Sequence, residues 1–247
     1  TVSTGVTQIT ITANDGVNQS VCTFTLTLED QTAPTATAQN ITVALDIDGY
    51  AEVAINDIDS GSSDNCGAIT KSLNTTIFSC DDIGQNEIIL TITDQGGLQS
   101  TATAIVTVVD TMAPQVVCQD ITLVLDENGQ VNITPQDIDA GSTDNCGIVS
   151  YSLDTTSFDC SNTGPNQVTL TLIDASANTS ASTAIVTVID AIAPTAVCQN
   201  ITLELDASGN ASISAQDIDA GSYDNCAVGQ IAINQTNFDC STIGVNQ

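Results

Sequence analysis

The most informative absences in this 247-residue sequence are those of imidazole and basic side chains. It contains no His and one basic residue, Lys71, against 30 Asp and Glu, which gives a formal net charge of -29. Without His, the Ser-His-Asp and Cys-His types of catalysis and His-ligated zinc are excluded. So acidic a chain repels polyanions and cannot form a basic groove, which excludes nucleic acid as a partner.

Aromatic residues and long apolar runs are also scarce. There is no Trp, and aromatic residues make up 3% of the chain, so any core must consist of Val, Ile, Leu and Ala. Such a core suits thin β-sandwiches. Few rings are available for stacking on a sugar, which argues against glycoside hydrolysis by paired carboxylates. No apolar run approaches the ~20 residues that span a bilayer, so we expect no membrane insertion in this segment.

Cysteine, by contrast, is frequent. The chain has nine cysteines, regularly spaced and without a C-x-x-C pair. This pattern favours disulfides formed in an oxidising compartment over a zinc or thioredoxin-like site. We therefore expect an extracellular location at the cell surface.

A repeat is the strongest positive signal in the sequence. The segment S-x-D-N-C ends at Cys66, Cys146 and Cys226, two steps of 80 residues (146 − 66 and 226 − 146). At the same period an Asp closes a β-rich run and precedes a short linker that ends in Pro, where strand pairing stops. These residues, Asp30, Asp110 and Asp190, mark the predicted repeat boundaries.

The period divides the chain into one upstream remnant, two whole repeats and one incomplete repeat. The predicted segments are 1–30, the C-terminal part of an upstream repeat, 31–110, 111–190, and 191–247, a truncated repeat. We accordingly expect the chain to be a piece of a longer protein.

Within repeat 111–190 the apolar residues alternate as in half-buried strands. Residues 121–126 place Ile121, Leu123 and Leu125 on one face, and the turn at 127–130 predicts a hairpin into 131–134. Further strands are predicted at 148–153, at 167–173 with Val168, Leu170 and Leu172 pointing inward, and at 182–189. No segment shows a helical period. About seven short strands in each repeat predict an all-β chain of tandem immunoglobulin-like sandwiches, elongated and with essentially no helix.

The residues of each repeat resemble the hyalin repeat (HYR) module. The shared features are D-x-T-A-P, C-Q-N-I-T, a D-G hairpin, the S-x-D-N-C loop, and F-x-C followed by G-x-N. Tandem copies with sequences like those of 198–206 and 217–226 are similar to repeats in very large surface adhesins of gliding Bacteroidetes, of the SprB type. The resemblance covers essentially the whole chain.

What the resemblance implies is a non-catalytic stalk or adhesin region, connected with cell adhesion, filaments, gliding motility and type IX secretion. The implied partners are surface glycans or proteins and the neighbouring repeats of the same chain. Two alternatives stay open: repeats that bind a glycan or protein ligand directly, and accessory modules of a secreted polysaccharide-degrading enzyme. A binder should vary its loops between copies, whereas the loop at 57–65 recurs almost unchanged.

The resemblance also bears on the cysteines. Such modules often carry one cysteine on the first strand and one on the last, as Cys22 does, but repeat 31–110 has Ala38 and Ala102 there. Its two remaining cysteines then form a self-contained bridge. The expected disulfides are Cys66–Cys80, Cys146–Cys160 and Cys226–Cys240. Two cysteines, Cys118 and Cys198, are left over; for Cys118 a buried thiol and intermolecular pairing both stay open, and Cys198 could find a partner beyond residue 247.

The acidic loop at 57–65, repeated at 137–145 and 217–225, is the candidate functional feature. Each copy has three carboxylates and one Asn, the oxygen ligands that calcium prefers. Strand alternation brings this loop to the same pole as the repeat boundary and the turn at Asp174, opposite the hairpin 46–49 of the preceding repeat. The predicted calcium ligands are Asp30, Asp57, Asp59, Asp64, Asp94, Asp110, Asp137, Asp139, Asp144, Asp174, Asp190, Asp217, Asp219 and Asp224.

A second reading of the acidic loop needs no metal. In that reading the Asp and Asn side chains cap turns by accepting hydrogen bonds from nearby N–H groups, and they keep the surface soluble. Separately, Thr111 and Thr155 each follow an Asp in the acceptor pattern of Bacteroidetes O-glycosylation, which makes them candidate modification sites.

Overall fold

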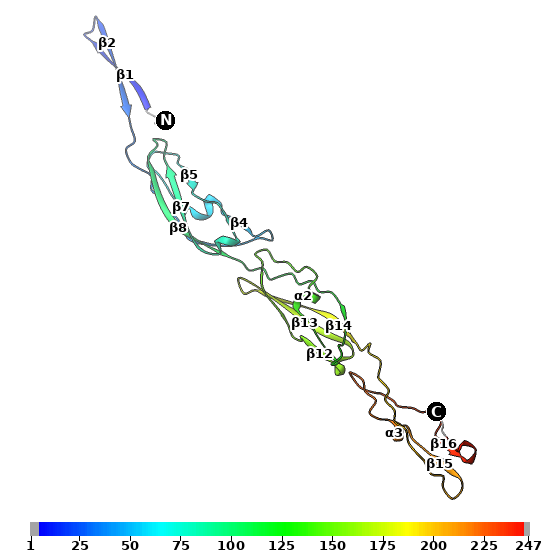
Figure 1. The fold of residues 1–247 in the computed structure, drawn as a ribbon. Coiled ribbons are helices and arrows are strands. Elements are labelled where there is room, and N and C mark those ends of the chain that lie inside the picture. The colour runs from blue at the N-terminus through cyan, green and yellow to red at the C-terminus, as the bar shows by residue number, and fades with distance from the viewer. Residues whose placement is uncertain (1–4, 245–247) are drawn as a thin grey trace. The chain divides into compact units, whose positions relative to one another are not determined.

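The computed structural model describes residues 5–244, and its regular secondary structure is mostly β-strand (Figure 1). Its contacts divide the chain into two compact units. The first runs to Pro114 and also contains 144–148 and 174–178, two short segments of repeat 111–190. The second comprises 115–143, 149–173 and the chain from Thr179. The units therefore do not coincide with the sequence repeats, because each combines residues from more than one of them.

Repeat 31–110 is a two-layered immunoglobulin-like sandwich. One layer is a four-stranded sheet in the order β3-β8-β7-β5, in which the first strand, β3, runs parallel to the last, β8. The other layer is the antiparallel pair β4–β6. The strands are β3 (Ile41–Ala44), β4 (Tyr50–Glu52), β5 (Thr70–Leu73), β6 (Ile77–Ser79), β7 (Gly84–Thr93) and β8 (Gln99–Val109).

Repeat 111–190 has the same two sheets. Its four-stranded sheet has the order β11-β13-β14-β9, with β9 parallel to β14, and its second layer is the pair β10–β12. The strands are β9 (Ile121–Val124), β10 (Gln130–Asn132), β11 (Ile148–Leu153), β12 (Ser157–Asp159), β13 (Gly164–Asp174) and β14 (Thr179–Ile189). All strand segments predicted in this repeat are present, and Val168, Leu170 and Leu172 are buried as expected.

Two local predictions were wrong. The turn after β9 forms, since Gly129 N donates to Asp126 O at 2.9 Å, but β9 and β10 do not pair as a hairpin because each joins a different sheet. Short helical turns also occur where none were expected. They are α1 (Ile55–Ile58), α2 (Pro135–Ile138), α3 (Ala215–Ile218) and the 3-10 turns η1 (Cys80–Asp82), η2 (Cys160–Asn162) and η3 (Cys240–Thr242).

The two remaining segments carry fewer strands. Residues 5–30 form one hairpin, β1 (Gly5–Asn14) with β2 (Gln19–Leu28), and residues 191–244 contain the pair β15 (Asn210–Ser212) and β16 (Asn237–Asp239). Residues 201–204, which correspond to β3 and β9, are not assigned as a strand. No counterpart of β8 or β14 follows them among the described residues, so they lack a strand to pair with.

The core of each sandwich consists of aliphatic side chains and one Phe. In repeat 111–190 these are Leu125, Ile133, Ile138, Phe158, Val168, Leu170, Leu172, Ala184, Val186 and Val188, all buried. Replacing a fully buried side chain here leaves a cavity as well as losing the transfer free energy.

We expect Leu170→Ala to lower the free energy of unfolding of its compact unit by about 3 kcal/mol. Leu170 is fully buried in the middle of β13, whereas Val149 on the neighbouring strand β11 is exposed. Val149→Ala is therefore the control and should change stability by less than ~0.5 kcal/mol. Urea unfolding measures both variants, and equal effects would contradict the assignment of the inward face.

Candidate cation and disulfide site

Three aspartates from distant parts of the sequence meet in the first compact unit. Asp110 follows β8, Asp144 lies in the loop after α2, and Asp174 ends β13. One carboxylate oxygen from each lies within 4.8 Å of the others. Asp110 and Asp174 are only 6% and 2% exposed, respectively. Three carboxylates so close, two of them buried, repel one another unless a cation neutralises them.

Backbone amides hold these carboxylates in position. Asp110 Oδ1 accepts a hydrogen bond from Met112 N at 3.0 Å, and Asp144 Oδ1 accepts one from Cys146 N at 2.9 Å. Asn178 donates to both oxygens of Asp174, each at 2.8 Å, and its Nδ2 also donates to Asp110 O at 3.2 Å. The turn after β13 thus orients the cluster.

The cluster also has buried oxygens whose hydrogen-bonding capacity is unused. Asp110 Oδ2, Asp144 Oδ2 and Asn145 Oδ1 are buried and have no hydrogen-bond partner among the described residues. Leaving such atoms without a partner is costly. A hard cation would satisfy them, and carboxylate and amide oxygens are the donor set of calcium or magnesium rather than of a thiophilic metal. Asp110, Asp144, Asp174 and Asn145 would hold it.

An equivalent cluster lies one repeat earlier. Asp30, Asp64 and Asp94 offer oxygens within 4.8 Å of one another, and Asp94 is buried. Asp94 Oδ2 and Asp64 Oδ1 are again buried without a partner. In repeat 191–247, Asp224 Oδ2 and Asn225 Oδ1 are likewise buried without a hydrogen-bond partner. In the part of the chain that the structure describes, however, no third acidic residue completes a cluster with Asp190 and Asp224.

The other predicted ligands lie outside these clusters. Asp57, Asp137 and Asp217 stand at the third position of α1, α2 and α3, where each accepts a hydrogen bond from the backbone N–H three residues earlier. This capping is the metal-free role weighed from the sequence, and in Asp137 and Asp217 it holds the carboxyl pKa below its usual value. Asp59, Asp139 and Asp219 instead accept from the serine three residues later, Ser62, Ser142 and Ser222.

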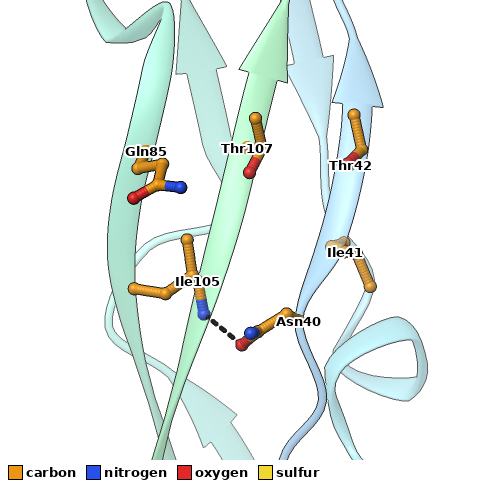
Figure 2. Close-up of a pocket in the computed structure, with 6 residues that line it drawn as sticks. All are labelled: Asn40, Ile41, Thr42, Gln85, Ile105 and Thr107. Atoms are coloured by element: carbon orange, nitrogen blue, oxygen red, sulfur yellow. Dashed lines mark hydrogen bonds between the residues drawn. The ribbon is translucent and has the colours of Figure 1, made fainter.

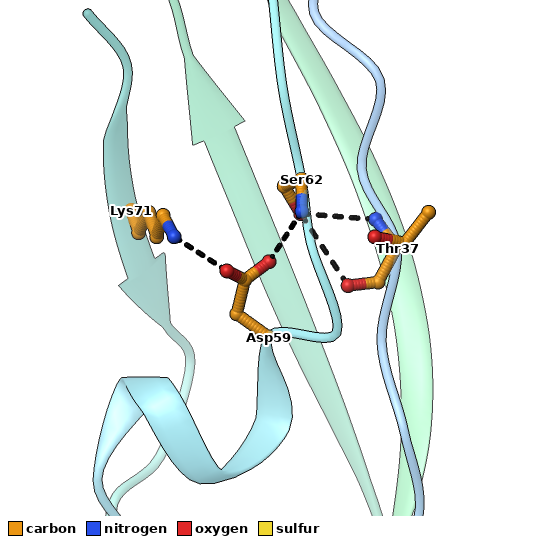
Figure 3. A network of polar contacts seen from close by, with 4 residues as sticks. All are labelled: Thr37, Asp59, Ser62 and Lys71. Atoms are coloured by element: carbon orange, nitrogen blue, oxygen red, sulfur yellow. Dashed lines mark hydrogen bonds and ion pairs between the residues drawn. The ribbon is translucent and has the colours of Figure 1, made fainter.

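Asp59 has an additional partner, the only basic side chain of the protein. Lys71 on β5 forms an ion pair with Asp59, and Ser62 connects Asp59 to Thr37 (Figure 3). The hydrogen bond from Lys71, followed by that from Ser62, lowers the pKa of Asp59 to about 2. At the matching position of repeat 111–190 the residue is Tyr151, so Asp139 has no such cation.

We expect this ion pair to make repeat 31–110 sensitive to acid. The folded pKa of Asp59 is below its unfolded value, so the stabilisation is complete above pH ~4 and is lost as pH falls toward 2. Because Lys71 is partly exposed, we expect the free energy of unfolding to fall by only about 1 kcal/mol over this pH range. In Lys71→Met most of this loss of stability between pH 4 and 2 should be absent when the free energy of unfolding is measured at each pH. An unchanged loss would contradict the assignment of the ion pair.

The disulfides join consecutive repeats instead of closing within one. The bonds are Cys80–Cys146 and Cys160–Cys226, with Cα–Cα distances of 5.4 and 5.3 Å. The predicted bridges Cys66–Cys80, Cys146–Cys160 and Cys226–Cys240 were therefore wrong. Cys66 lies beside the cluster of Asp30, Asp64 and Asp94, at the C-terminal end of β7. Cys80 precedes the N-terminal end of that ten-residue strand. A strand of this length spans ~33 Å, far beyond disulfide reach.

The turn at 46–49 lies against the segment that carries Cys146. Asn145 Nδ2 donates to Asp46 O at 3.1 Å, and Cys80 Sγ lies 3.4 Å from Asn145 O. The same contacts recur as Asn225 Nδ2 to Asp126 O at 3.1 Å and Cys160 Sγ to Asn225 O at 3.6 Å. This agrees with the expected placement of the 46–49 turn against the acidic loop.

Gly129, in the second copy of this turn, leaves no room for a side chain. A Cβ there would lie 2.6 Å from Cys160 Sγ and 2.7 Å from Asn225 O, whereas a Cβ at Gly141 meets nothing within 4 Å. Both glycines have positive φ, 71° and 93°. We expect Gly129→Ala to slow Cys160–Cys226 formation during refolding at least ~5-fold, and Gly141→Ala to show only the backbone strain they share. Peptide mapping of refolding time points measures it; equal rates would contradict the close approach.

Five cysteines are free: Cys22, Cys66, Cys118, Cys198 and Cys240. Cys118 is half-buried and forms no disulfide within the chain, and Cys198 is exposed. Hydrogen bonding to Asp30, with some burial and the nearby carboxylates, raises the pKa of the Cys66 thiol. Thr111 is exposed and Thr155 half-buried, and their modification stays a prediction.

A shallow depression lies on the four-stranded sheet of repeat 31–110 (Figure 2). It is lined by Asn40, Ile41, Thr42, Gln85, Ile105 and Thr107. Asn40 Oδ1 accepts a hydrogen bond from Ile105 N at 2.8 Å, so its role is to join β3 to β8. None of the lining residues is acidic or basic, and the depression offers no paired acid and base.

Comparisons with known proteins give only remote likenesses. No family model matches the sequence, and no curated protein does. Among solved structures, protocadherin gammaB7 EC3-6 has 18% identity and a TM-score of 0.34, over 82% of this chain and 62% of that chain. Mouse cadherin-23 EC22-24 has 14% identity and a TM-score of 0.32, over 75% of each chain. An endo-fucoidan hydrolase of glycoside hydrolase family 107 has 14% identity and a TM-score of 0.27, over 77% of this chain and 35% of its own.

These TM-scores support no inference about function. The chain spans about a third of the length of the fucoidan hydrolase and less than two thirds of the protocadherin fragment. Among the described residues, no helix is long and apolar enough to cross a membrane.

Proposed function

We propose that this chain is a non-catalytic, extracellular repeat region of a large surface adhesin, a load-bearing stalk of HYR-like modules of the SprB gliding-adhesin type. Its support is the 80-residue repeat, the immunoglobulin-like sandwiches and the two disulfides. Disulfides of this kind persist in oxidising surroundings, which supports secretion. The role in adhesion and gliding rests on the sequence resemblance.

The observation that carries the proposal is one three-residue segment with three attachments. Asp144, Asn145 and Cys146 belong to repeat 111–190 in sequence, yet lie in the compact unit of repeat 31–110. Asp144 enters the buried carboxylate cluster, Asn145 donates to Asp46 O, and Cys146 is bonded to Cys80. Asp224, Asn225 and Cys226 repeat the last two attachments one step later. Consecutive repeats are thus linked by more than the polypeptide linker.

The proposal includes calcium at the clusters of Asp30, Asp64, Asp94 and of Asp110, Asp144, Asp174. The supporting facts are the mutual proximity of the carboxylates and the buried oxygens without partners. When bound, the ion would neutralise three carboxylates and tie the D-N-C segment to the end of the preceding repeat. No chemistry beyond this structural neutralisation is required of it.

Stretching single molecules tests the load-bearing role. Each disulfide encloses a sequence separation of 66 residues that cannot extend under force. At ~3.6 Å per residue the oxidised protein should be shorter at full extension than the reduced protein by roughly 240 Å per bond. We also expect higher unfolding forces in calcium than in chelator. Equal lengths, or forces that do not depend on calcium, would refute the tension-bearing stalk.

A further inference from the structure

The candidate cation site and one disulfide share a segment of three residues, 144–146. Asp144 contributes a carboxylate to the cluster with Asp110 and Asp174. Two positions later, Cys146 is bonded to Cys80. All five residues lie in the first compact unit. A cation that fixes the position of Asp144 would therefore act on the disulfide as well.

The two oxygens of Asp144 have different roles. Its Oδ1 accepts a hydrogen bond from Cys146 N at 2.9 Å, whereas its Oδ2 is buried and has no hydrogen-bond partner among the described residues. Oδ2 is thus available to a cation while Oδ1 holds the backbone of Cys146. Cys146 and Cys80 both pack against the buried core of repeat 31–110, so the held cysteine already faces its partner.

Asn145 makes a second connection between the cluster and the disulfide. Its Nδ2 donates to Asp46 O at 3.1 Å and to Asp110 Oδ1 at 3.4 Å, and its Oδ1 is buried without a partner. Its backbone carbonyl oxygen lies 3.4 Å from Cys80 Sγ. A cation bound to Asn145 Oδ1 would fix this side chain, and with it the backbone that Cys80 contacts.

This arrangement makes ion binding and bond formation help each other. In the reduced protein, Cys146 must meet Cys80 across a sequence separation of 66 residues, and closing so long a loop costs entropy. An ion that holds segment 144–146 against Asp110 has already met much of that cost, which raises the effective concentration of one thiol near the other. Linkage is reciprocal, so the bond must strengthen ion binding by the same factor.

We propose that calcium at Asp110, Asp144 and Asp174 protects the Cys80–Cys146 disulfide from reduction, which makes this connection between repeats sensitive to both calcium and redox conditions. The inference rests on the proposed calcium site and adds its regulation. A dithiol reductant opens the bond by passing two electrons and two protons to it. Cys80 and Cys146 become thiols, and the reductant becomes its own disulfide. Removing calcium shifts this equilibrium toward the open, reduced form.

Asp110 and Asp94 form a matched pair for the test. They are 6% and 7% exposed, and the Oδ1 of each accepts a backbone hydrogen bond, from Met112 N at 3.0 Å and from Leu98 N at 2.8 Å. The Oδ2 of each is buried without a partner. Asn at either position therefore keeps the Oδ1 bond and removes one carboxylate from a cluster.

Only one of the two clusters includes segment 144–146. Asp94 belongs to the cluster with Asp30 and Asp64. It follows β7, whereas Cys80 precedes that ten-residue strand, which spans ~33 Å. Both clusters lie in the same compact unit. Asp94→Asn therefore controls for any protection that comes from general stabilisation of the unit by calcium.

The experiment measures the equilibrium between the bond and its two thiols. The parent protein, Asp110→Asn and Asp94→Asn are equilibrated in dithiothreitol redox buffers, with saturating calcium or with chelator. They are then quenched in acid, alkylated and mapped for Cys80–Cys146. We expect calcium to raise the equilibrium constant for bond formation at least ~5-fold in the parent and in Asp94→Asn, but less than ~2-fold in Asp110→Asn.

The reciprocal measurement leaves the cluster unchanged. In the double variant Cys80→Ser with Cys146→Ser, we expect one of the two calcium sites to bind at least ~5-fold more weakly than in the parent, and the other to bind as before. Isothermal calorimetry measures both affinities. This arm tests the coupling even if Asp110→Asn does not fold.

The outcomes separate the coupling from the calcium site itself. If the parent binds calcium at both sites but the redox equilibrium does not respond to calcium, the coupling is overturned and the proposed site stands. Equal responses in Asp110→Asn and Asp94→Asn, or unchanged calcium affinities in the double cysteine variant, would also overturn the coupling. No calcium binding by the parent would overturn both the site and the coupling.

Discussion

Replacing Cys160 and Cys226 together with Ser is expected to lower the free energy of unfolding of their compact unit by about 4 kcal/mol. The bond closes a loop with a sequence separation of 66 residues, and constraining a loop of that size removes about this much chain entropy from the unfolded state. Replacing both cysteines avoids leaving a new free thiol. Urea unfolding under non-reducing conditions provides the measurement.

The control for this prediction is Cys198→Ser, which removes an exposed free cysteine from the same unit. It should leave stability within ~0.5 kcal/mol of the parent. A reducing agent should weaken this unit in the parent and in the control but leave it unchanged in the double variant, whose remaining disulfide, Cys80–Cys146, lies in the other unit. If Cys66→Ser instead produced the large loss, Cys66 would be a structural disulfide partner and the linkage between repeats would be wrong.

The second large effect is that of Asp144→Asn on Tm, which should be opposite in sign in chelator and in calcium. For the parent protein, calcium at a hundred times its Kd should stabilise the unit that holds both clusters by about 2.7 kcal/mol for each ion bound, or roughly 10 °C in Tm per ion. In chelator, Asp144→Asn should raise Tm by about 3 °C, because it removes one of three carboxylates that repel one another within 4.8 Å. In calcium the same variant should melt well below the parent, because a ligand has been lost.

Asp137→Asn is the matched control on the same acidic loop. Asp137 accepts its hydrogen bonds from Thr134 and lies outside the cluster, so its replacement should lower stability by about 0.5 kcal/mol with or without calcium. Differential scanning calorimetry in calcium and in chelator compares the three proteins. If Asp144→Asn and Asp137→Asn behaved alike in both buffers, Asp144 would be another turn-capping residue.

The sequence alone predicts much of the fold because the repeat shows the same strand pattern several times. Alternation located β11 at its exact bounds and identified Val168, Leu170 and Leu172 as buried. It could not predict that β9 and β10 would join different sheets, since a turn with Gly129 fits a hairpin and a crossover equally well. The one-turn helices also escaped, because four residues are too few for a helical period.

The site was predicted in part, for a reason that is visible in the strand order. Reasoning about poles brought Asp110, Asp144 and Asp174 together, as the structure does. The same reasoning places Cys80 at the opposite pole from Cys66, beside the next repeat, and could have identified the Cys80–Cys146 bond. The misleading signal was that repeat 31–110 contains only two cysteines, Cys66 and Cys80, which suggested a bridge between them. Which aspartates cap a turn and which reach the cluster depends on loop geometry that spacing does not reveal.

Calcium titration by isothermal calorimetry tests the central claim most directly, that the buried carboxylate clusters are cation sites at the repeat boundaries. The account predicts two ions per chain at the clusters of Asp30, Asp64, Asp94 and of Asp110, Asp144, Asp174, with Kd values of roughly 0.1 to 1 mM as in extracellular modules. Asp144→Asn should remove one of the two sites, and Asp137→Asn neither. No binding by the parent protein at millimolar calcium, or two sites retained in Asp144→Asn, would contradict the account.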